Sequence, residues 1–367
     1  MIRVLHVLGG LDRGGAETFV MNLYRSIDRS QIQFDFITHT EGKQAYFEEI
    51  ESLGGKVYWF KRFNGKNIVE IKRQWDYFFA EHPEYKILHS HVRSYASVFI
   101  PIAKKHGLVT IVHSHSTSNG SGIAAIVKDI LQFPLRYQAD YLFSCSKEAG
   151  EWLFGKKATK RDNYKIINNG IILSRYRFDN TVRKSYRDSL GINDSTIVFC
   201  HVGRFHEAKN HRFLIRIYKD YLKAAHQNTK LIMVGDGPLK AEIEKEIDEF
   251  GIKEHVELLG SRSDVSQLLM ASDCFLFPSQ WEGLPVSVIE AQAAGLTCLI
   301  SDTITKDVAI SELVKYLPIG KGTSIWVKKM NQLDYKRMNV SELIVEHGFD
   351  ISTEAEKMGA FYKRIIE

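Results

Sequence analysis

The chain has 367 residues, of which 44% are apolar and 25% are charged, and this length allows two ordinary globular domains. Lysine and arginine number 49 against 44 aspartates and glutamates, so the formal net charge is only +5. A charge this small does not indicate a nucleic-acid partner, although a mildly basic surface suits anionic substrates or an anionic lipid surface.

Other features of the sequence exclude further classes of protein. No apolar run approaches the roughly 18 to 20 residues that span a bilayer, and Ile2–Leu8 leads into glycines rather than a signal cleavage site. The four cysteines lie singly in apolar runs, at Cys145, Cys200, Cys274 and Cys298. We therefore expect buried free thiols in a cytoplasmic protein whose membrane contact, if any, is peripheral.

Short β-branched runs alternate with longer amphipathic stretches along almost the whole chain, which is typical of a parallel sheet with crossover helices. The strands predicted in the first half are Ile2–Leu8, Phe34–Thr38, Lys56–Phe60, Ile87–Ser90, Val109–His113 and Tyr141–Cys145. A second series follows at Thr196–Val202, Lys230–Val234, His255–Leu258, Cys274–Phe277 and Thr297–Ser301. We predict an α/β protein with two doubly wound sheets, and an active site in a cleft at the carboxyl ends of their strands.

The polar, turn-rich segment 168–180 separates the two series and places the domain boundary near residues 172–185. Near the end of the chain, Thr353–Glu356 has the pattern of a capping box and precedes an amphipathic stretch. We therefore divide the chain into a first domain over residues 1–178, a second over 179–350 and a C-terminal helix over 351–367.

The first predicted strand leads into a glycine-rich turn, Gly9–Glu17, that precedes a helix. Backbone without side chains can approach a ligand closely, and a helix N-terminus favours anionic groups. The spacing is not Gly-x-Gly-x-x-Gly, so a nicotinamide cofactor is not supported. The alternative is an ordinary strand-to-helix turn.

Two histidines, His113 and His115, follow the strand predicted at Val109–His113. Such a pair can ligate a metal, but no acidic or cysteine partner is near in sequence, and metal sites normally have three or four ligands. We therefore expect no metal and interpret one histidine as a polar group beside the reacting atoms. His113 is favoured because it ends the predicted strand, and His115 is the alternative.

The loop His201–Asn210 follows the first strand of the second half. Gly203 permits a tight exit from the strand, and Arg204 and Lys209 can converge on an anion such as a diphosphate. The alternative is a pair of solvated cations.

Two further strand exits lie in the second half. In Val234–Leu239, Gly235 lies in the turn and Pro238 suits the first turn of a helix. In the next exit, Asp264 is predicted to cap a helix, which leaves Gly260 to Arg262 to line a pocket.

The segment Ser279–Gly295 places Glu282 in a loop and Glu290 in the first turns of a helix that starts near Pro285. A loop carboxylate can accept hydrogen bonds from sugar hydroxyls, a helical one can hold a ribose diol, and the helix N-terminus can receive phosphate. The alternative is that Glu290 complements the helix dipole and Glu282 is solvated.

Together these residues resemble the retaining glycosyltransferases of family 4, which have the GT-B architecture of two facing Rossmann-like domains. The resemblance covers nearly the whole chain. It rests on Gly14–Glu17, the histidine loop, Asn169-Gly170, Gly203-Arg204 with Lys209, Gly235–Pro238 and the Glu-x7-Glu pattern of Glu282 and Glu290.

The resemblance implies that the second domain binds a nucleotide sugar, expected to be a UDP-sugar, that the first holds the acceptor, and that the C-terminal helix packs back on the first. Arg204 and Lys209 would bind the diphosphate, Glu290 the ribose and Glu282 the sugar, with Arg262 near the base. The implied catalytic residues are His113, Glu282, Arg204 and Lys209. The implied donor-binding residues are Gly14, Gly15, Gly203, Arg204, Lys209, Gly235, Arg262, Glu282, Gly283, Leu284, Pro285, Val286 and Glu290.

The family usually needs no metal, and the mechanism often proposed for it is front-face attack without a protein nucleophile. Pro285 stands where many members have glycine, so one possible backbone donor to the sugar is absent and the donor sugar stays open. The segment Lys56–Lys66 mixes cations with aromatics, which suits a membrane carrying a polyprenyl-linked glycan acceptor, or else a buried strand and a solvated loop.

The function expected from these features is a hexosyltransferase of capsule or exopolysaccharide synthesis. The alternatives are a GT-B epimerase acting on a nucleotide sugar and a regulatory module that binds a nucleotide sugar without turnover.

Overall fold

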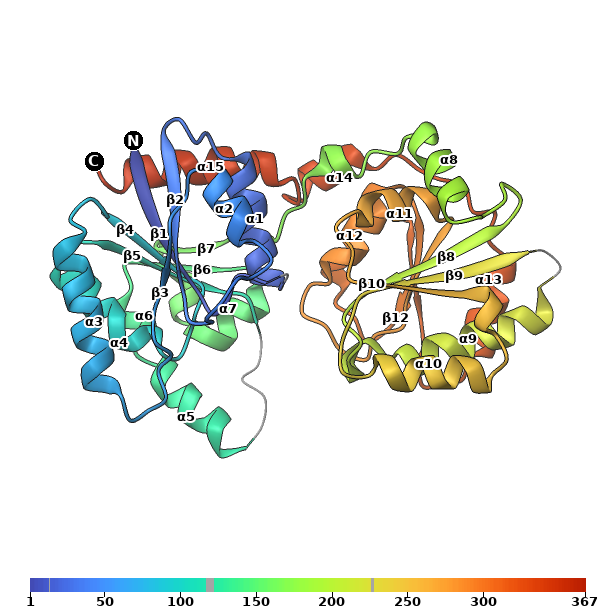
Figure 1. Cartoon of the computed structure of the whole chain (residues 1–367), viewed down its shortest axis with the longest axis horizontal. Helices are drawn as coiled ribbons and strands as arrows, with labels where there is room; N and C mark the ends of the chain where they lie inside the picture. Colours follow the sequence, from blue (N-terminus) through green and yellow to red (C-terminus); the bar gives the residue numbers. More distant parts are fainter. Residues whose placement is uncertain (13, 117–121, 226–227) are drawn as a thin grey trace. The chain divides into compact units, whose positions relative to one another are not determined.

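The computed structural model of the chain describes residues 1–12, 14–116, 122–225 and 228–367 (Figure 1). The chain forms two compact units. The first comprises Met1–Gly170 together with Gly348–Glu367, and the second comprises Ile171–His347. Each unit contains a parallel sheet with helices on its faces, which confirms the predicted α/β class and the two Rossmann-like domains of the GT-B architecture.

The first unit has a seven-stranded parallel sheet in the order β3-β2-β1-β4-β5-β6-β7. Its strands are β1 Ile2–Leu8, β2 Ile32–Thr38, β3 Val57–Trp59, β4 Ile87–Ser90, β5 Val109–Ser114, β6 Tyr141–Ser144 and β7 Tyr164–Ile166. Its helices are α1 Gly15–Ser26, α2 Phe47–Ser52, α3 Ile68–Glu81, α4 Ala96–Lys105, α5 Ile123–Gln132, α6 Leu135–Gln138, α7 Lys147–Phe154 and α15 Ile351–Arg364.

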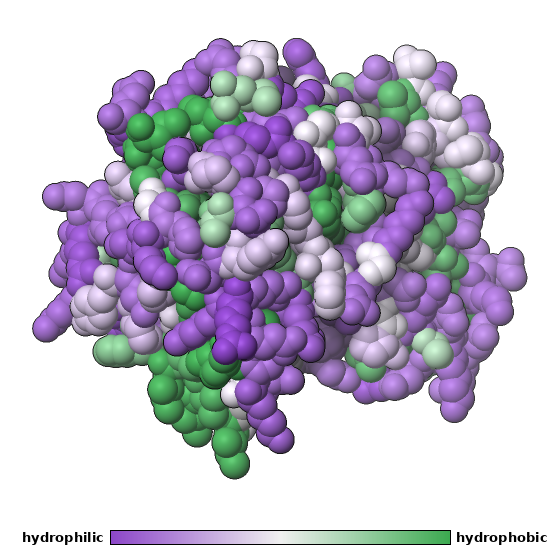
Figure 2. All heavy atoms as spheres, turned by 60° about the vertical axis from the view of Figure 1, so that its left-hand side comes forward, coloured by the Kyte–Doolittle hydropathy of each residue, from purple (hydrophilic) through white to green (hydrophobic). Residues whose placement is uncertain are grey.

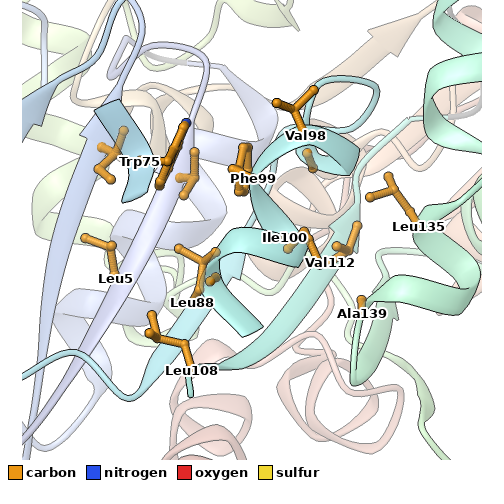
Figure 3. Packing of buried hydrophobic residues seen from close by; sticks show 14 of the residues in the cluster. Leu5, Trp75, Leu88, Val98, Phe99, Ile100, Leu108, Val112, Leu135 and Ala139 are labelled. Atoms are coloured by element: carbon orange, nitrogen blue, oxygen red, sulfur yellow. The ribbon is translucent and has the colours of Figure 1, made fainter. Parts of the chain in front are cut away.

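The two faces of this sheet differ in chemistry because side chains alternate along each strand. One face presents Leu5, Leu88 and Val112 to α3 and α4, whose Trp75 and Phe99 stack with ring centroids 4.3 Å apart (Figure 3). The other face of the same strands carries histidines and is covered by α1 and α15. The face toward α3 and α4 is therefore apolar, whereas the opposite face combines buried histidines with buried aromatics such as Phe34.

The C-terminal helix α15 packs on the first unit, as the resemblance implied. The hydroxyl of Tyr362 lies 2.7 Å from Nδ1 of His89 in β4. The helix begins at Ile351, the first residue of the predicted segment, but its cap is not the Thr353–Glu356 pattern: the carboxylate of Asp350 accepts a hydrogen bond from the backbone amide of Thr353.

The second unit has a six-stranded parallel sheet in the order β10-β9-β8-β11-β12-β13. Its strands are β8 Ile197–Val202, β9 Thr229–Val234, β10 Val256–Gly260, β11 Cys274–Phe277, β12 Thr297–Ser301 and β13 Val314–Leu317. Its helices are α8 Asn180–Ser189, α9 His211–Ala224, α10 Lys240–Glu249, α11 Val265–Ala271, α12 Val286–Ala293, α13 Ser324–Asn331 and α14 Ser341–Glu346. Short 3-10 helices span Ala158–Lys160 in the first unit, and Leu173–Arg175, Glu207–Lys209, Lys253–His255 and Lys306–Val308 in the second.

All four cysteines are buried and free, as predicted. Burial raises the pKa of each thiol, so each is held in its protonated form. Within the part of the chain that the structure describes, no helix combines the length and the apolarity that crossing a bilayer requires.

Candidate functional site

The loops at the carboxyl ends of β8 and β11 bring Lys209 and Glu282 together in the second unit. The Nζ atom of Lys209 lies 2.7 Å from Oε1 of Glu282, and their side chains are only 18% and 15% exposed. The same ammonium group lies 4.7 Å from the centroid of the Phe277 ring. The predicted phosphate ligand and the predicted sugar ligand are therefore direct neighbours, which the sequence did not reveal.

Two hydrogen bonds between the loops fix this pair. Lys209 ends a 3-10 helix, and the next residue, Asn210, adopts a left-handed conformation with φ of 55°. The side-chain amide of Asn210 donates from Nδ2 to the carbonyl of Pro278, and the backbone amide of Gln280 donates to the carbonyl of Ala208 at 2.7 Å. The β8 loop is thus tied to the β11 loop at two points, which limits the freedom of Lys209.

Glycines are required where the loops after β8 and β9 meet. Gly235 has φ of +140°, and a Cβ atom there would lie 2.1 Å from the carbonyl oxygen of Gly203. At Gly203, a Cβ would lie 3.1 Å from Cδ of Lys209, so glycine leaves room for the lysine stem. Pro238 stands just before α10 rather than in its first turn, which corrects the expected position.

Two arginines of the predicted donor site have different surroundings. Arg204 is exposed, and it forms no ion pair with any of the described residues. Arg262 forms a two-pronged pair with Asp264, at 2.8 and 2.5 Å. Asp264 occupies the N-cap position of α11, as predicted, but its side chain makes no cap bond because Arg262 and the hydroxyl of Tyr186 bind that carboxylate.

Glu290 lies in α12, as predicted, and its carboxylate is held by a residue that the sequence reasoning missed. The hydroxyl of Tyr176 donates to Oε1 of Glu290 at 2.5 Å. Burial raises the pKa of Glu290 to about 7, and the bond from Tyr176 opposes that shift. Tyr176 belongs to the turn-rich segment between the strand series, where only its aromatic side chain set it apart.

The rest of the Ser279–Gly295 segment forms the entry to α12. Glu282 lies in the loop, as expected, and Pro285 is buried at the N-cap position of the helix. Gly283 is exposed, whereas Leu284 and Val286 are partly buried. The first amides of α12 therefore follow directly after the Lys209–Glu282 pair along the chain, as a site for an anionic group requires.

In the first unit, Gly14 and Gly15 lie at the start of α1 and both are exposed. The carboxylate of Glu17 fills the space beside Gly14, where an added Cβ would lie 2.3 Å from Oε2. Burial raises the pKa of Glu17, and the nearby charge of Asp12 adds to the shift. The predicted glycine turn therefore includes a carboxyl group next to the helix N-terminus.

The predicted histidine pair belongs to a larger cluster. His113 lies in β5 and is fully buried, whereas His115 follows the strand and is partly exposed. The fold adds His6 from β1, and His89 and His91 from β4 and the residue after it. Sequence reasoning missed these three, although His89 and His91 repeat the same alternate spacing as His113 and His115.

Hydrogen bonds join three rings of this cluster. Nδ1 of His6 lies 3.0 Å from Nε2 of His91, and Nδ1 of His91 lies 2.8 Å from Nε2 of His115. Burial, followed in most of the rings by the neighbouring histidines, lowers the pKa of all five, and that of His115 falls to about 3. The rings are therefore neutral at physiological pH.

Two segments of the first unit expose large apolar side chains. In Lys56–Lys66, Trp59 is 46% exposed while Phe60 is buried and Tyr58 is partly buried, so most of the aromatics belong to the core. Helix α5 and the residues after it expose a larger set, and Figure 2 shows this apolar group at the lower edge of the molecule. The set comprises Ile123, Ile126, Val127, Ile130, Phe133 and Tyr137.

Cationic side chains surround a pocket close to this apolar set. The pocket has a volume of about 230 Å³ and is lined in part by Arg136, Lys156, Lys157 and Arg161. The guanidinium carbon of Arg136 lies 4.3 Å from the centroid of the Phe133 ring, and that of Arg161 lies 5.3 Å from the Tyr137 ring. Apolar and cationic surface are therefore adjacent in this part of the first unit.

Comparisons with known proteins show the family to which the chain belongs. Residues 13–175 match the model of Glycosyltransferase Family 4, and residues 182–317 match that of Glycosyl transferases group 1. EpsF of Bacillus subtilis strain 168, described provisionally as a glycosyltransferase, is 36% identical over 359 residues, which are 95% of this chain and 93% of EpsF. The capsular polysaccharide biosynthesis glycosyltransferase CapH of Staphylococcus aureus is 22% identical over 99% of both chains.

A shorter match is to an Escherichia coli enzyme named UDP-Gal:alpha-D-GlcNAc-diphosphoundecaprenol alpha-1,3-galactosyltransferase, 31% identical over 37% of this chain and 36% of that protein. Among solved structures, Anabaena HepE in complex with UDP and glucose has a TM-score of 0.73, with 18% identity over 98% of this chain and 95% of HepE. That likeness supports the fold. Because EpsF exceeds 30% identity across nearly its whole length, and both units match their family models, this chain belongs to the family 4 glycosyltransferases, of GT-B architecture.

Proposed function

We propose that this glycosyltransferase transfers a hexosyl group from a UDP-sugar to a polyprenyl-diphosphate-linked glycan during assembly of an exopolysaccharide or capsule. The observation that carries the donor half of the proposal is the Lys209–Glu282 pair beside the start of α12, with Glu290 and Tyr176 in the same unit. HepE was solved with UDP and with UDP-glucose, which supports a uridine nucleotide. The name of the Escherichia coli relative supports a lipid-diphosphate acceptor.

Lys209 and Arg204 have complementary roles in this proposal. The Lys209 ammonium, held by Glu282 in the free protein, turns to the diphosphate when the donor binds, and the exposed Arg204 adds a second cation. Glu282, released from the pair, accepts hydrogen bonds from sugar hydroxyls. Fixed cations stabilise the charge that develops on the leaving UDP, so they act mainly in the transition state.

The proposed chemistry retains the anomeric configuration by front-face attack. The bond between the anomeric carbon and the UDP oxygen breaks, the acceptor hydroxyl forms the new glycosidic bond, and its proton passes to the departing phosphate. No protein nucleophile takes part, so Glu282 and Glu290 are ligands rather than an acid and base pair. Gly14 and Gly15 lie at the start of α1, where backbone amides favour an anionic group.

Burial separates the roles of the two histidines predicted near the sugar. His115 is partly exposed and can contact a substrate, whereas His113 is fully buried behind it, with ring centroids 4.1 Å apart. We therefore assign the substrate contact to His115 and place His113 as the residue that positions it. Exchanging His115 for alanine should lower turnover more than UDP affinity.

The acceptor lipid requires contact with a membrane, and helix α5 supplies the best surface for it. Its exposed apolar side chains suit the acyl boundary, and the neighbouring arginines and lysines suit anionic headgroups. We therefore propose α5 as the membrane contact rather than Lys56–Lys66, whose aromatics are mostly buried. The polyprenyl diphosphate would meet the first unit from this side.

The proposal is tested by incubating the protein with a panel of nucleotide sugars and an undecaprenyl-diphosphate-linked sugar. We expect one UDP-sugar to raise the melting temperature and to release UDP only when the acceptor is present. Isomerisation of the sugar without acceptor would instead identify an epimerase. Binding without either reaction, across the panel of acceptors, would identify a regulatory module.

A further inference from the structure

Five imidazole rings gather on one face of the first sheet. The register pairs His6 of β1 with His89 of β4, and alternation places His91, His113 and His115 on the same side. Stacked rings lie as close as 4.1 Å between the centroids of His113 and His115. The rings pack among buried apolar side chains on this face, where the ring centroids of His6 and Phe34 lie 4.1 Å apart.

Three of the rings have the spacing of a metal site. His91, His113 and His115 each offer a ring nitrogen, and these atoms all lie within 4.8 Å of one another. Two imidazole nitrogens bound to one Zn²⁺ at about 2.0–2.1 Å lie roughly 3 Å apart. The separation between Nδ1 of His91 and Nε2 of His115 is 2.8 Å, so small ring movements would allow both to bind the same ion.

His113 supplies the second, independent observation. It is fully buried, yet neither Nδ1 nor Nε2 has a hydrogen-bond partner in the described part of the chain. A neutral imidazole carries one donor and one acceptor, and burying both unsatisfied is costly and rare. The rings of Phe19 and Phe143 approach it edge-on and offer no polar atom. A metal bound by one of its nitrogens would account for a buried polar ring in this position.

A second trio, His6, His89 and His91, also has ring nitrogens within 4.8 Å of one another. It is less suitable because His6 and His89 are fully buried and Tyr362 already engages Nδ1 of His89, which leaves no route of entry. His115, by contrast, is partly exposed. In the first trio, His6 has another role: its Nδ1 can accept from Nε2 of His91 and so orient that ring, as outer partners of metal-bound histidines do.

We propose that His91, His113 and His115 bind one divalent transition-metal ion of the Zn²⁺ type, with His6 orienting His91. Imidazole ligands suit Zn²⁺, Ni²⁺, Cu²⁺ and Co²⁺ rather than Mg²⁺ or Ca²⁺. Three protein ligands leave a fourth position for water or for a group of the substrate. Gly14 and Gly15 share the first unit with this site, and the other donor-binding residues lie in the second unit.

The test uses the untagged full-length chain, stripped of metal with a chelator and titrated with Zn²⁺ against a competing colorimetric indicator. We expect one Zn²⁺ per chain, and Co²⁺ should give the visible absorption band of a four-coordinate site. The double variant His113→Gln/His115→Gln should weaken Zn²⁺ binding by more than roughly tenfold. His255→Gln, an exposed histidine of the second unit, is the matched control and should bind as the unaltered chain does.

Circular dichroism in the presence of chelator checks that the variants fold. If the double variant does not fold, the single variant His115→Gln, at the partly exposed position, replaces it. Equal Zn²⁺ affinity in the altered and unaltered chains would overturn the proposal. So would loss of binding in His89→Gln with binding retained in His113→Gln/His115→Gln, because the ion would then occupy the other trio.

Discussion

At the scale of single residues, the donor half of the site depends on charges that change partners. Lys209 and Glu282 are bound to each other in the free protein, and Glu290 is bound by Tyr176. A ligand must therefore replace existing interactions. The contribution of each residue to the free energy of binding is the difference between its contacts with the ligand and its contacts in the free protein. Substitutions reveal this difference when UDP binding and protein stability are measured on the same variant.

Lys209→Ala should weaken UDP binding by about 1.5 to 3 kcal/mol, because a charged hydrogen bond to phosphate is lost. Isothermal calorimetry with UDP measures this. Lys223→Ala removes an exposed lysine of the same unit and should leave UDP affinity unchanged. The double variant Lys209→Ala/Glu282→Gln should recover part of any loss in stability, since Glu282 is then no longer left unpaired. Unaltered UDP affinity in Lys209→Ala would contradict its place in the donor site.

Titration of Glu290 should make the stability of the folded protein depend on pH. Its pKa rises from the ordinary 4.5 to about 7 in the folded protein, so the folded state holds more protons than the unfolded state between these values. The contribution of Glu290 to stability therefore falls as pH rises from about 4.5 to 7 and is constant above. Urea unfolding at pH 5 and pH 8 should show a smaller loss of stability in Glu290→Gln than in the unaltered chain.

The same residue should make UDP binding depend on pH, because a ribose diol donates best to the carboxylate form. Affinity should rise between pH 6 and 8 in the unaltered chain by more than in Glu290→Gln, which corrects for titration of the UDP phosphate itself. Parallel pH profiles in the two proteins would show that Glu290 does not contact the ribose.

At the scale of elements, the sequence predicted best the strands that are buried between two neighbouring strands. Ile87–Ser90 and Cys274–Phe277 have the predicted bounds, and each is buried throughout and flanked by two strands. The strands that were missed, Tyr164–Ile166 and Val314–Leu317, lie at sheet edges and mix lysine and tyrosine with few aliphatic residues. Edge strands have less burial, and therefore a weaker pattern in the sequence.

For the site, the sequence predicted the positions of single residues but not the contacts between residues that are far apart in the chain. Glu282, Glu290 and Lys209 could be placed from sequence because each follows a recognisable strand. The Lys209–Glu282 contact could not, since it depends on how two loops meet. The histidine cluster was missed because strand order places β1 beside β4, and β4 beside β5, whereas these strands are far apart along the chain.

Helix α5 provides the prediction at the element scale. Ile126→Ser/Ile130→Ser removes two exposed apolar side chains and should reduce sedimentation with vesicles containing anionic lipid. Val69→Ser, at an exposed apolar position in α3 of the same unit, is the matched control and should sediment as the unaltered chain does. Equal sedimentation of the α5 variant and the control would remove α5 as the membrane contact, and activity on a soluble acceptor should be unchanged in both.

At the scale of the whole molecule, two separate cores predict two unfolding transitions in calorimetry. UDP should raise mainly the melting temperature of the second unit, and Zn²⁺ that of the first. Each ligand should stabilise its unit by about 2.7 kcal/mol at a ligand concentration one hundred times its Kd. A single transition that both ligands shift equally would show that the two units unfold as one.

The first unit is built from both ends of the chain, and this has a consequence during synthesis on the ribosome. The sheet of Met1–Gly170 emerges first, but α15, which covers it and whose Tyr362 contacts His89, is among the last segments made. The second unit, Ile171–His347, is complete before that helix appears. Domains generally fold in the order in which they are made. Here the first unit can complete its packing only after the whole second unit has been synthesised, because α15 follows the second unit in the chain. The part of the histidine face around His89, which Tyr362 of α15 contacts, is therefore covered last.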